Sequence, residues 1–302
     1  MLRACGRHKV PIWRLAFTLL AVVSATVAAA QQPPKSHASP APRQIILPPK
    51  LVAGAQATLA VLDSQGRLLA NIAVDLSGGQ KVTTDATGRA LFKATNDPGT
   101  LVAKISGQTI SAAATVVAPK DPGAHGTPES SRGGANIVSY PHVMAVHDRF
   151  TLEGSGFRGA ADSNRVFLND DPCLVVASSP VSLVVLPGPR VPIGAVNLHV
   201  TIGGIDAGQF SVSAVLLEFS GPVEAVNAGS AGELILHVRG TTDPLVLEVR
   251  NGTPRVIQLA KGNVQRLKTS GGEQNIAPVE VKFVTGGNYS VSARLVLPIS
   301  HE

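Results

Sequence analysis

The stretch FTLEGSGF at residues 150–157 decides the fold of this chain, together with NRVFL at 164–168 and CLVV at 173–176. Each run consists mainly of aliphatic, aromatic or β-branched residues and is bounded by Gly, Asn, Asp or Pro, which are turn residues. The same rhythm continues at residues 181–186 and 195–202. Because no amphipathic helical window of useful length interrupts these runs, they predict short strands joined by turns.

The order of these strands resembles an IPT/TIG domain, an immunoglobulin-like fold shared by plexins, some transcription factors and many bacterial surface proteins. An opening P…F-T-L-x-G-x-G-F runs from Pro141 to Phe157, and V-x-L-N-x-x-P-C runs from Val166 to Cys173. We therefore expect residues 136–217 to form a TIG-like β-sandwich. TIG domains of metazoan transcription factors contact DNA, but this segment has four basic residues against six acidic ones, so we expect no nucleic-acid partner.

The preceding segment, 44–118, shows the same pattern of strands and turns. Ile72, Val74 and Leu76 alternate with other residues, which predicts a strand with one buried face. Residues 79–107 resemble bacterial immunoglobulin-like and carboxypeptidase-regulatory-like repeats, through TDATGRA followed by PGT. This resemblance implies a further β-sandwich.

The last segment, 218–302, predicts a third small β-sandwich of no recognised family, with alternating strands such as 279–283. Residues 119–135 are rich in Pro, Gly and Ser and predict a linker. We therefore expect the first sandwich to move as an independent arm. Residues 215–219 run apolar from the second sandwich into the third, which predicts that these two dock.

Residues 1–30 have the three parts of a secretory signal peptide. Four basic residues precede an apolar run at 15–30, which ends in three alanines. We expect cleavage after Ala30; an uncleaved N-terminal anchor is the alternative. Cys5 precedes the apolar run and so cannot serve as a lipoprotein cysteine. Residues 31–43 contain four prolines and predict a flexible tether.

Composition narrows the classes of function. Of 302 residues, 44% are hydrophobic and 15% charged, which is typical of a folded protein. The 26 Lys and Arg residues include four in the leader, which leaves 22 against 20 Asp and Glu residues. This near balance of charge does not indicate a nucleic-acid-binding protein. Cys5 and Cys173 are the two cysteines, which excludes a disulfide scaffold and any Cys-rich metal site.

Several residues suggest chemistry, and each has a structural interpretation that we favour. Gly154-Ser155-Gly156 could begin a nucleotide loop, but no helix pattern follows, so we expect a strand corner. Asp170 and Asp171 could bind a cation, but Asn-Asp-Asp-Pro is typical of a turn.

The histidines and Cys173 also have structural interpretations that we favour. His142 and His147 are five residues apart, which places them on opposite faces of an extended segment and favours surface histidines over a zinc site. Cys173 lies beside an apolar strand, which favours a buried inert thiol over a nucleophile. The sequons at Asn251 and Asn288 are expected to be turn residues.

Together these observations predict an all-β protein, with a signal peptide followed by tandem immunoglobulin-like β-sandwich domains. We expect a non-enzymatic binding, adhesion or spacer protein, exported to the periplasm, cell surface or medium and not integral to a membrane after leader cleavage. We predict no catalytic, cofactor-binding or metal residues and no cofactor, and a protein or cell-surface partner of unknown identity. The alternatives are an accessory subunit of a secretion or pilus assembly, or a polysaccharide-binding protein, which the scarcity of Trp and Tyr disfavours.

Overall fold

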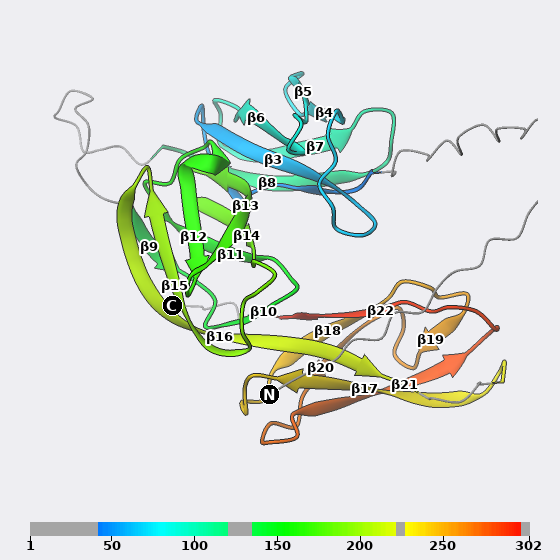
Figure 1. Cartoon of the computed structure of the whole chain (residues 1–302). Helices are drawn as coiled ribbons and strands as arrows, with labels where there is room; N and C mark the ends of the chain where they lie inside the picture. Colours follow the sequence, from blue (N-terminus) through cyan, green and yellow to red (C-terminus); the bar gives the residue numbers. More distant parts are fainter. Residues whose placement is uncertain (1–41, 120–134, 222–226, 297–302) are drawn as a thin grey trace, which may run out of the picture. The chain divides into compact units, whose positions relative to one another are not determined.

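A computed structural model describes residues 42–119, 135–221 and 227–296 of the chain (Figure 1). These residues lie almost entirely in strands and turns. The one helical piece among them is η1 (Ala161–Ser163), a single 3-10 turn. The all-β fold class predicted from the sequence is therefore confirmed.

Parts of the prediction fall outside these residues. The leader at 1–30 lies wholly outside them, as do most of the tether at 31–43 and residues 120–134 of the linker. Pro42 and Arg43, which the prediction placed in the tether, belong to the first strand. Within the described ranges, no helix has the length and apolar character needed to span a bilayer.

The first module (42–119) is a sandwich of two sheets around a core that includes Leu51, Leu59 and Leu101. One sheet has the order β1-β3-β6, and the other β2-β8-β7-β4-β5. Its strands are β1 (Pro42–Ile46), β2 (Lys50–Val52), β3 (Gln56–Asp63), β4 (Ala73–Leu76), β5 (Lys81–Thr83), β6 (Arg89–Lys93), β7 (Gly99–Ile105) and β8 (Ser111–Val117).

The second module (135–215) surrounds a core that includes Leu152, Leu168 and Leu198. Strand β13 pairs with β14 on one sheet and β12 on the other, and a bulge between Val175 and Ala177 redirects it. Its strands are β9 (Asn136–Ser139), β10 (Val143–Ala145), β11 (Phe150–Ser155), β12 (Asn164–Leu168), β13 (Asp171–Ser179), β14 (Ser182–Leu186), β15 (Gly194–Ile202) and β16 (Ile205–Ser220).

The third module packs sheet β16-β17-β21-β19 against sheet β20-β18-β22. Strand β16 pairs with β15 as far as Ala214 and with β17 from Leu216 onward, so one strand crosses the predicted boundary at 217/218. The expected docking of these two modules is therefore present. The further strands are β17 (Ala231–Arg239), β18 (Val246–Asn251), β19 (Ile257–Leu259), β20 (Val264–Lys268), β21 (Ile276–Phe283) and β22 (Val291–Leu295).

The first module is not an independent arm, and that prediction is wrong. Strand β3 is buried on both faces: Leu59 and Val61 lie in the first module's core, whereas Ala60 and Leu62 pack against the second module. An uninterrupted apolar run, rather than an alternating one, is the pattern of a strand covered on both sides. We call this second cluster the junction cluster; its members are Ile46, Ala60, Leu62, Val176, Ala177 and Val184.

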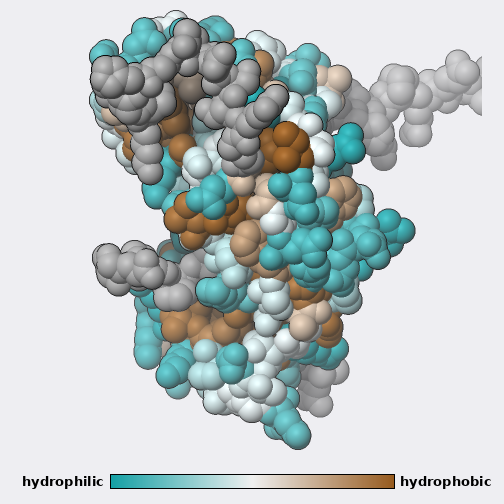
Figure 2. Space-filling model, turned by 90° about the vertical axis from the view of Figure 1, so that its left-hand side faces the viewer, coloured by the Kyte–Doolittle hydropathy of each residue, from teal (hydrophilic) through white to brown (hydrophobic). Residues whose placement is uncertain are grey.

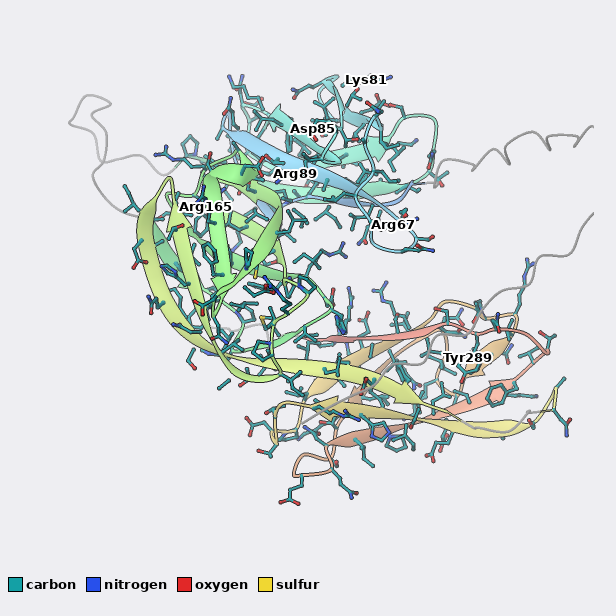
Figure 3. All side chains as sticks on the ribbon, viewed as in Figure 1. Arg67, Lys81, Asp85, Arg89, Arg165 and Tyr289 are labelled. Atoms are coloured by element: carbon teal, nitrogen blue, oxygen red, sulfur yellow. The ribbon has the colours of Figure 1, made fainter. Side chains whose placement is uncertain are left out.

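Polar groups at the same junction find partners across it. Thr58 Oγ1 donates a hydrogen bond to the carbonyl oxygen of Gly159, at 2.6 Å. Arg89, labelled in Figure 3, donates from Nη1 to the carbonyl of Val175, and its Nη2 lies 2.7 Å from Asp162 Oδ1. The Arg89 side chain is only 9% exposed, so these partners compensate a buried charge.

Exposed hydrophobic side chains are distributed over the modules, with Val138, Ile205 and Val264 each at least half exposed. On the face that Figure 2 draws, brown hydrophobic residues are interspersed with teal hydrophilic ones. Single exposed apolar residues of this kind are normal for protein surfaces and do not mark a site.

Candidate functional site

A hollow of about 400 Å³ lies where residues of all three modules meet. Gln44 comes from β1, residues 147–149 from the second module, and the remainder mainly from β18 and β22. The volume is in the range of sites for small ligands. Its charged lining residues are Asp148, Arg149, Glu248, Arg250 and Arg294. We call it the arginine hollow.

Strand register places most of these charges on the outward face of sheet β20-β18-β22. Glu248 pairs with Arg266 on β20 and with Arg294 on β22. Directly paired residues of antiparallel strands point to the same face. This face therefore carries Arg250, Arg266, Lys268 and Arg294 with a single carboxylate, Glu248. Leu247 and Val249, which alternate with these residues on β18, are fully buried in the core.

Glu248 holds two of the arginines in place. Its Oε1 accepts a hydrogen bond from Arg250 Nε at 2.7 Å, and Arg294 Nη2 lies 2.7 Å from the same oxygen. The Glu248 side chain is 9% exposed, whereas both guanidinium side chains are about half exposed. The hydrogen bond from Arg250 is the main cause that lowers the pKa of Glu248 below its ordinary value. The carboxylate therefore stays charged at neutral pH and fixes both guanidinium groups.

Arg149 approaches the hollow from the second module with weaker compensation. Its Nη2 donates to Gln44 Oε1 at 3.1 Å, and its backbone N donates to Asp148 Oδ1. Among the described residues its guanidinium forms no ion pair. Burial lowers the pKa of Arg149, because the charged form loses solvation. A partly desolvated cation with a neutral acceptor still has capacity for an anion.

A second hollow, of about 360 Å³, lies over β12 and β13 beside Arg165, Phe167 and Cys173. Burial raises the pKa of Cys173 to about 11, so the thiol is protonated at neutral pH. Its Sγ is 3.9 Å from the carbonyl of Asp171, a weak contact. These surroundings agree with an inert thiol and not with an activated nucleophile.

Comparison with known protein families identifies the middle of the chain. The model of the IPT/TIG domain matches residues 140–219. These residues form an IPT/TIG domain. The match confirms the resemblance seen in the sequence and reaches into β16, the strand that enters the third module. Among curated proteins, none matches this chain.

Solved structures that match this chain include two proteins of glycan utilization loci. SGBP-B from the mixed-linkage glucan locus of Bacteroides ovatus, in complex with a heptasaccharide, has 10% identity and a TM-score of 0.26, covering 85% of this chain and 72% of its own. SGBP-B from a xyloglucan locus of Bacteroides uniformis has 11% identity and a TM-score of 0.27, covering 85% and 98%. The surface layer protein SbsC, domains 1–6, has 12% identity and a TM-score of 0.21, covering 85% and 39%. TM-scores this low establish no functional relationship.

Within the IPT/TIG domain, Asp170 lies in a hairpin turn, as the sequence predicts, and Asp171 is the first residue of β13. Leu168 pairs with Asp171 across a two-residue loop whose first residue, Asn169, has φ of 53°. Asp171 Oδ2 accepts a hydrogen bond from the backbone of Arg190. In the described parts of the chain, no group of three or more His, Cys, Asp or Glu residues is arranged to hold a metal ion.

The glycines of the IPT/TIG opening allow a close strand approach and a corner, which confirms the structural interpretation. A Cβ at Gly154 would lie 2.1 Å from the carbonyl oxygen of Asn136 on β9. Gly156 has φ of +81°, a backbone conformation that favours glycine. These two glycines therefore shape the edge of the sheet.

The histidines do not converge in the described structure. His142 meets Tyr140 edge-on, His199 stacks on Phe167, and His237 shares a 2.8 Å hydrogen bond with Ser220. His147 lines the arginine hollow. Outside the described residues lie Cys5, His37, His125 and His301.

The sequon at Asn251 begins at the end of β18 and continues into the turn that follows. Its Oδ1 accepts a hydrogen bond from the backbone of Thr253, and its Nδ2 donates to the carbonyl of Ile257. The arginine hollow itself was not among the predicted sites. The only signal in the sequence is the i,i+2 spacing of charges in Glu248/Arg250 and Arg266/Lys268, which indicates a charged strand face.

Proposed function

We propose that this chain is an exported, non-enzymatic binding protein of the cell envelope or extracellular space. One observation supports this above the others: three β-sandwiches combine to line a single charged hollow. The shared strand β16 joins the second and third modules, and the junction cluster packs the first module on the second, so the parts that line the hollow are in contact. A preorganised site loses less free energy on binding than one that must first be ordered.

The chemistry of the hollow favours binding over catalysis. A general acid or base needs a pKa near the working pH. The pKa of Glu248 is lowered, which moves it further from neutral pH. Arg149 remains protonated although burial lowers its pKa. Groups with fixed charges hold a ligand and orient it, but they exchange no proton with it.

Two alternatives are separated by the nature of the partner. An accessory subunit of a secretion or pilus assembly would bind protein, whereas a polysaccharide-binding protein would bind glycan. The polar side chains that line the hollow are charged, amide, hydroxyl and imidazole groups, with no Trp or Tyr for stacking on neutral sugars. This composition favours a charged glycan over a neutral one.

To test this proposal, the full chain is expressed in a bacterial host and purified from the envelope fraction and the medium. We expect an intact mass that begins at Gln31 and saturable co-sedimentation of this protein with purified envelope material. Digestion of the envelope with protease should leave binding intact, and periodate oxidation of its glycans should abolish it. The reverse pattern would support the assembly subunit. Retention of the leader, or turnover of envelope material by the chain, would refute the proposal.

A further inference from the structure

The arginine hollow combines three guanidinium groups from separate segments. Arg149 comes from the second module, Arg250 from β18 and Arg294 from β22. The carboxylate of Glu248 lies against two of them. Arg149 is bonded to the neutral amide of Gln44, and the charge of neighbouring Asp148 acts on it without an ion pair. The positive charge of the three arginines is therefore only partly compensated by carboxylates in contact with them.

Charge is concentrated on this face well beyond the average of the chain. The outward face of sheet β20-β18-β22 carries four cationic residues and one carboxylate, whereas residues 31–302 together carry 22 basic against 20 acidic residues. A local excess of this kind attracts anions. Among the residues that line the hollow itself, three arginines stand against the two carboxylates of Asp148 and Glu248.

We propose that the arginine hollow binds the carboxylate or sulfate group of an acidic saccharide. Guanidinium groups present planar pairs of N–H donors that match the two oxygens of such groups. Gln44, Ser292 and His147 line the same hollow and supply neutral donors and acceptors suited to sugar hydroxyls. The inference rests on the proposed binding function and names the ligand class of that site.

Other classes of ligand fit the lining less well. Neutral sugars and nucleobases are usually held by stacking on Trp, Tyr or Phe. The only ring among the lining residues is the imidazole of His147. Recognition here depends on charge and on hydrogen bonds, which selects for an anionic group on the sugar.

Glu248 has a specific role in this arrangement. Its carboxylate occupies Arg250 and Arg294 from within the chain, at 2.7 Å from each, and so competes with an incoming anion. Removing that negative charge should free both guanidinium groups for the ligand. Glu248→Gln is therefore expected to strengthen anion binding, an effect opposite to that of simple damage to a site.

The experiment measures binding of D-glucuronate, inorganic sulfate and neutral D-glucose to residues 31–302 by isothermal titration calorimetry at constant ionic strength. We expect saturable binding of glucuronate, weaker binding of sulfate, and no response to glucose. Arg149→Gln and Arg294→Gln should each weaken glucuronate binding by about tenfold, as is usual for loss of a charge-assisted hydrogen bond. Glu248→Gln should strengthen it several-fold.

Arg266→Gln is the matched control, because Arg266 lies on the same sheet face but does not line the hollow. It should change glucuronate affinity by less than about twofold, as expected for screened surface charge. Thermal unfolding of each variant checks that the fold is kept. Arg149 lies outside the β18–β22 ladder, so Arg149→Gln tests the site even where a variant on those strands does not fold.

The outcomes are separable. Equal affinity for glucuronate and sulfate would overturn the saccharide assignment, because the sugar ring would then contribute nothing to binding. Absence of saturable glucuronate binding, an equal loss in Arg266→Gln and Arg149→Gln, or weaker binding by folded Glu248→Gln would each overturn the inference. If the hollow fails these tests while envelope co-sedimentation persists, the binding function stands and another surface carries it.

Discussion

The packing of the first module on the second predicts a measurable cost for Leu62→Ala. Leu62 is 4% exposed and belongs to the junction cluster. Leu→Ala substitutions at buried sites cost about 2–5 kcal/mol, and a small cluster between two modules relaxes more easily than a domain core. We therefore take the low end, about 2 kcal/mol, which corresponds to about 30-fold in a dissociation constant.

The assay turns the junction into a binding equilibrium. A protease site placed between residues 120 and 134 allows the chain to be cut after folding, so that only non-covalent contacts join the two pieces. We expect the cut wild-type pieces to co-elute in size-exclusion chromatography. Leu62→Ala should raise their dissociation constant about 30-fold. Leu91→Ala is the matched control, because Leu91 lies on neighbouring β6 and is 50% exposed.

Two results would refute this reasoning. If the cut wild-type pieces separate at micromolar concentration, the junction cluster does not hold the modules, and the independent arm predicted from the linker is correct. If Leu62→Ala and Leu91→Ala weaken association equally, burial at the junction does not account for its stability. Circular dichroism of each separated piece excludes unfolding of the first module as the cause.

Three further predictions follow from single residues. Since burial raises the pKa of Cys173 to about 11, iodoacetamide at pH 8 should alkylate it about a hundredfold more slowly in the native chain than in urea, as mass spectrometry can measure. Gly154→Ala should destabilise the fold by about 1–3 kcal/mol in urea unfolding, because its Cβ meets the Asn136 carbonyl, whereas Gly286→Ala, with open space around it, should not. The pKa of Glu248 is lowered below 4.5, so its contribution to stability is present above that pH and lost as the pH falls. Glu248→Gln should reduce the dependence of the melting temperature on pH in this acidic range, and an unchanged dependence would contradict the prediction.

Local patterning made the strands and turns predictable. In β21 the residues Val279, Val281 and Phe283 are buried and alternate with exposed ones, as period-two patterning predicts. Asp63 ends β3 in a turn where its Oδ1 accepts hydrogen bonds from the backbone of Gln65 and Arg67. Such features depend on residues close in sequence, so they can be read without knowing the tertiary structure.

The junction between the first two modules was missed because composition was given more weight than pattern. Residues 119–135 have the composition of a linker, but linker composition says nothing about whether the modules beside it touch. The informative signal was the sequence ATLAVL at residues 57–62, which does not alternate with charged residues, and every position of it is buried. A single-sheet surface strand would alternate, so six consecutive buried residues require a covering on both faces.

The arginine hollow was missed for a different physical reason. Net charge sums over the chain, and the third module mixes basic and acidic residues, so the excess on one face disappears from the total. Glu248, Arg266 and Arg294 are neighbours only through strand register, which the spacing within each strand does not specify. Arg149 belongs to another module: it follows β10, which pairs with β16, and β16 continues into the third module. A site built by register and module packing leaves no contiguous motif, so for tandem sandwiches of this kind the search for function must follow the faces of the sheets.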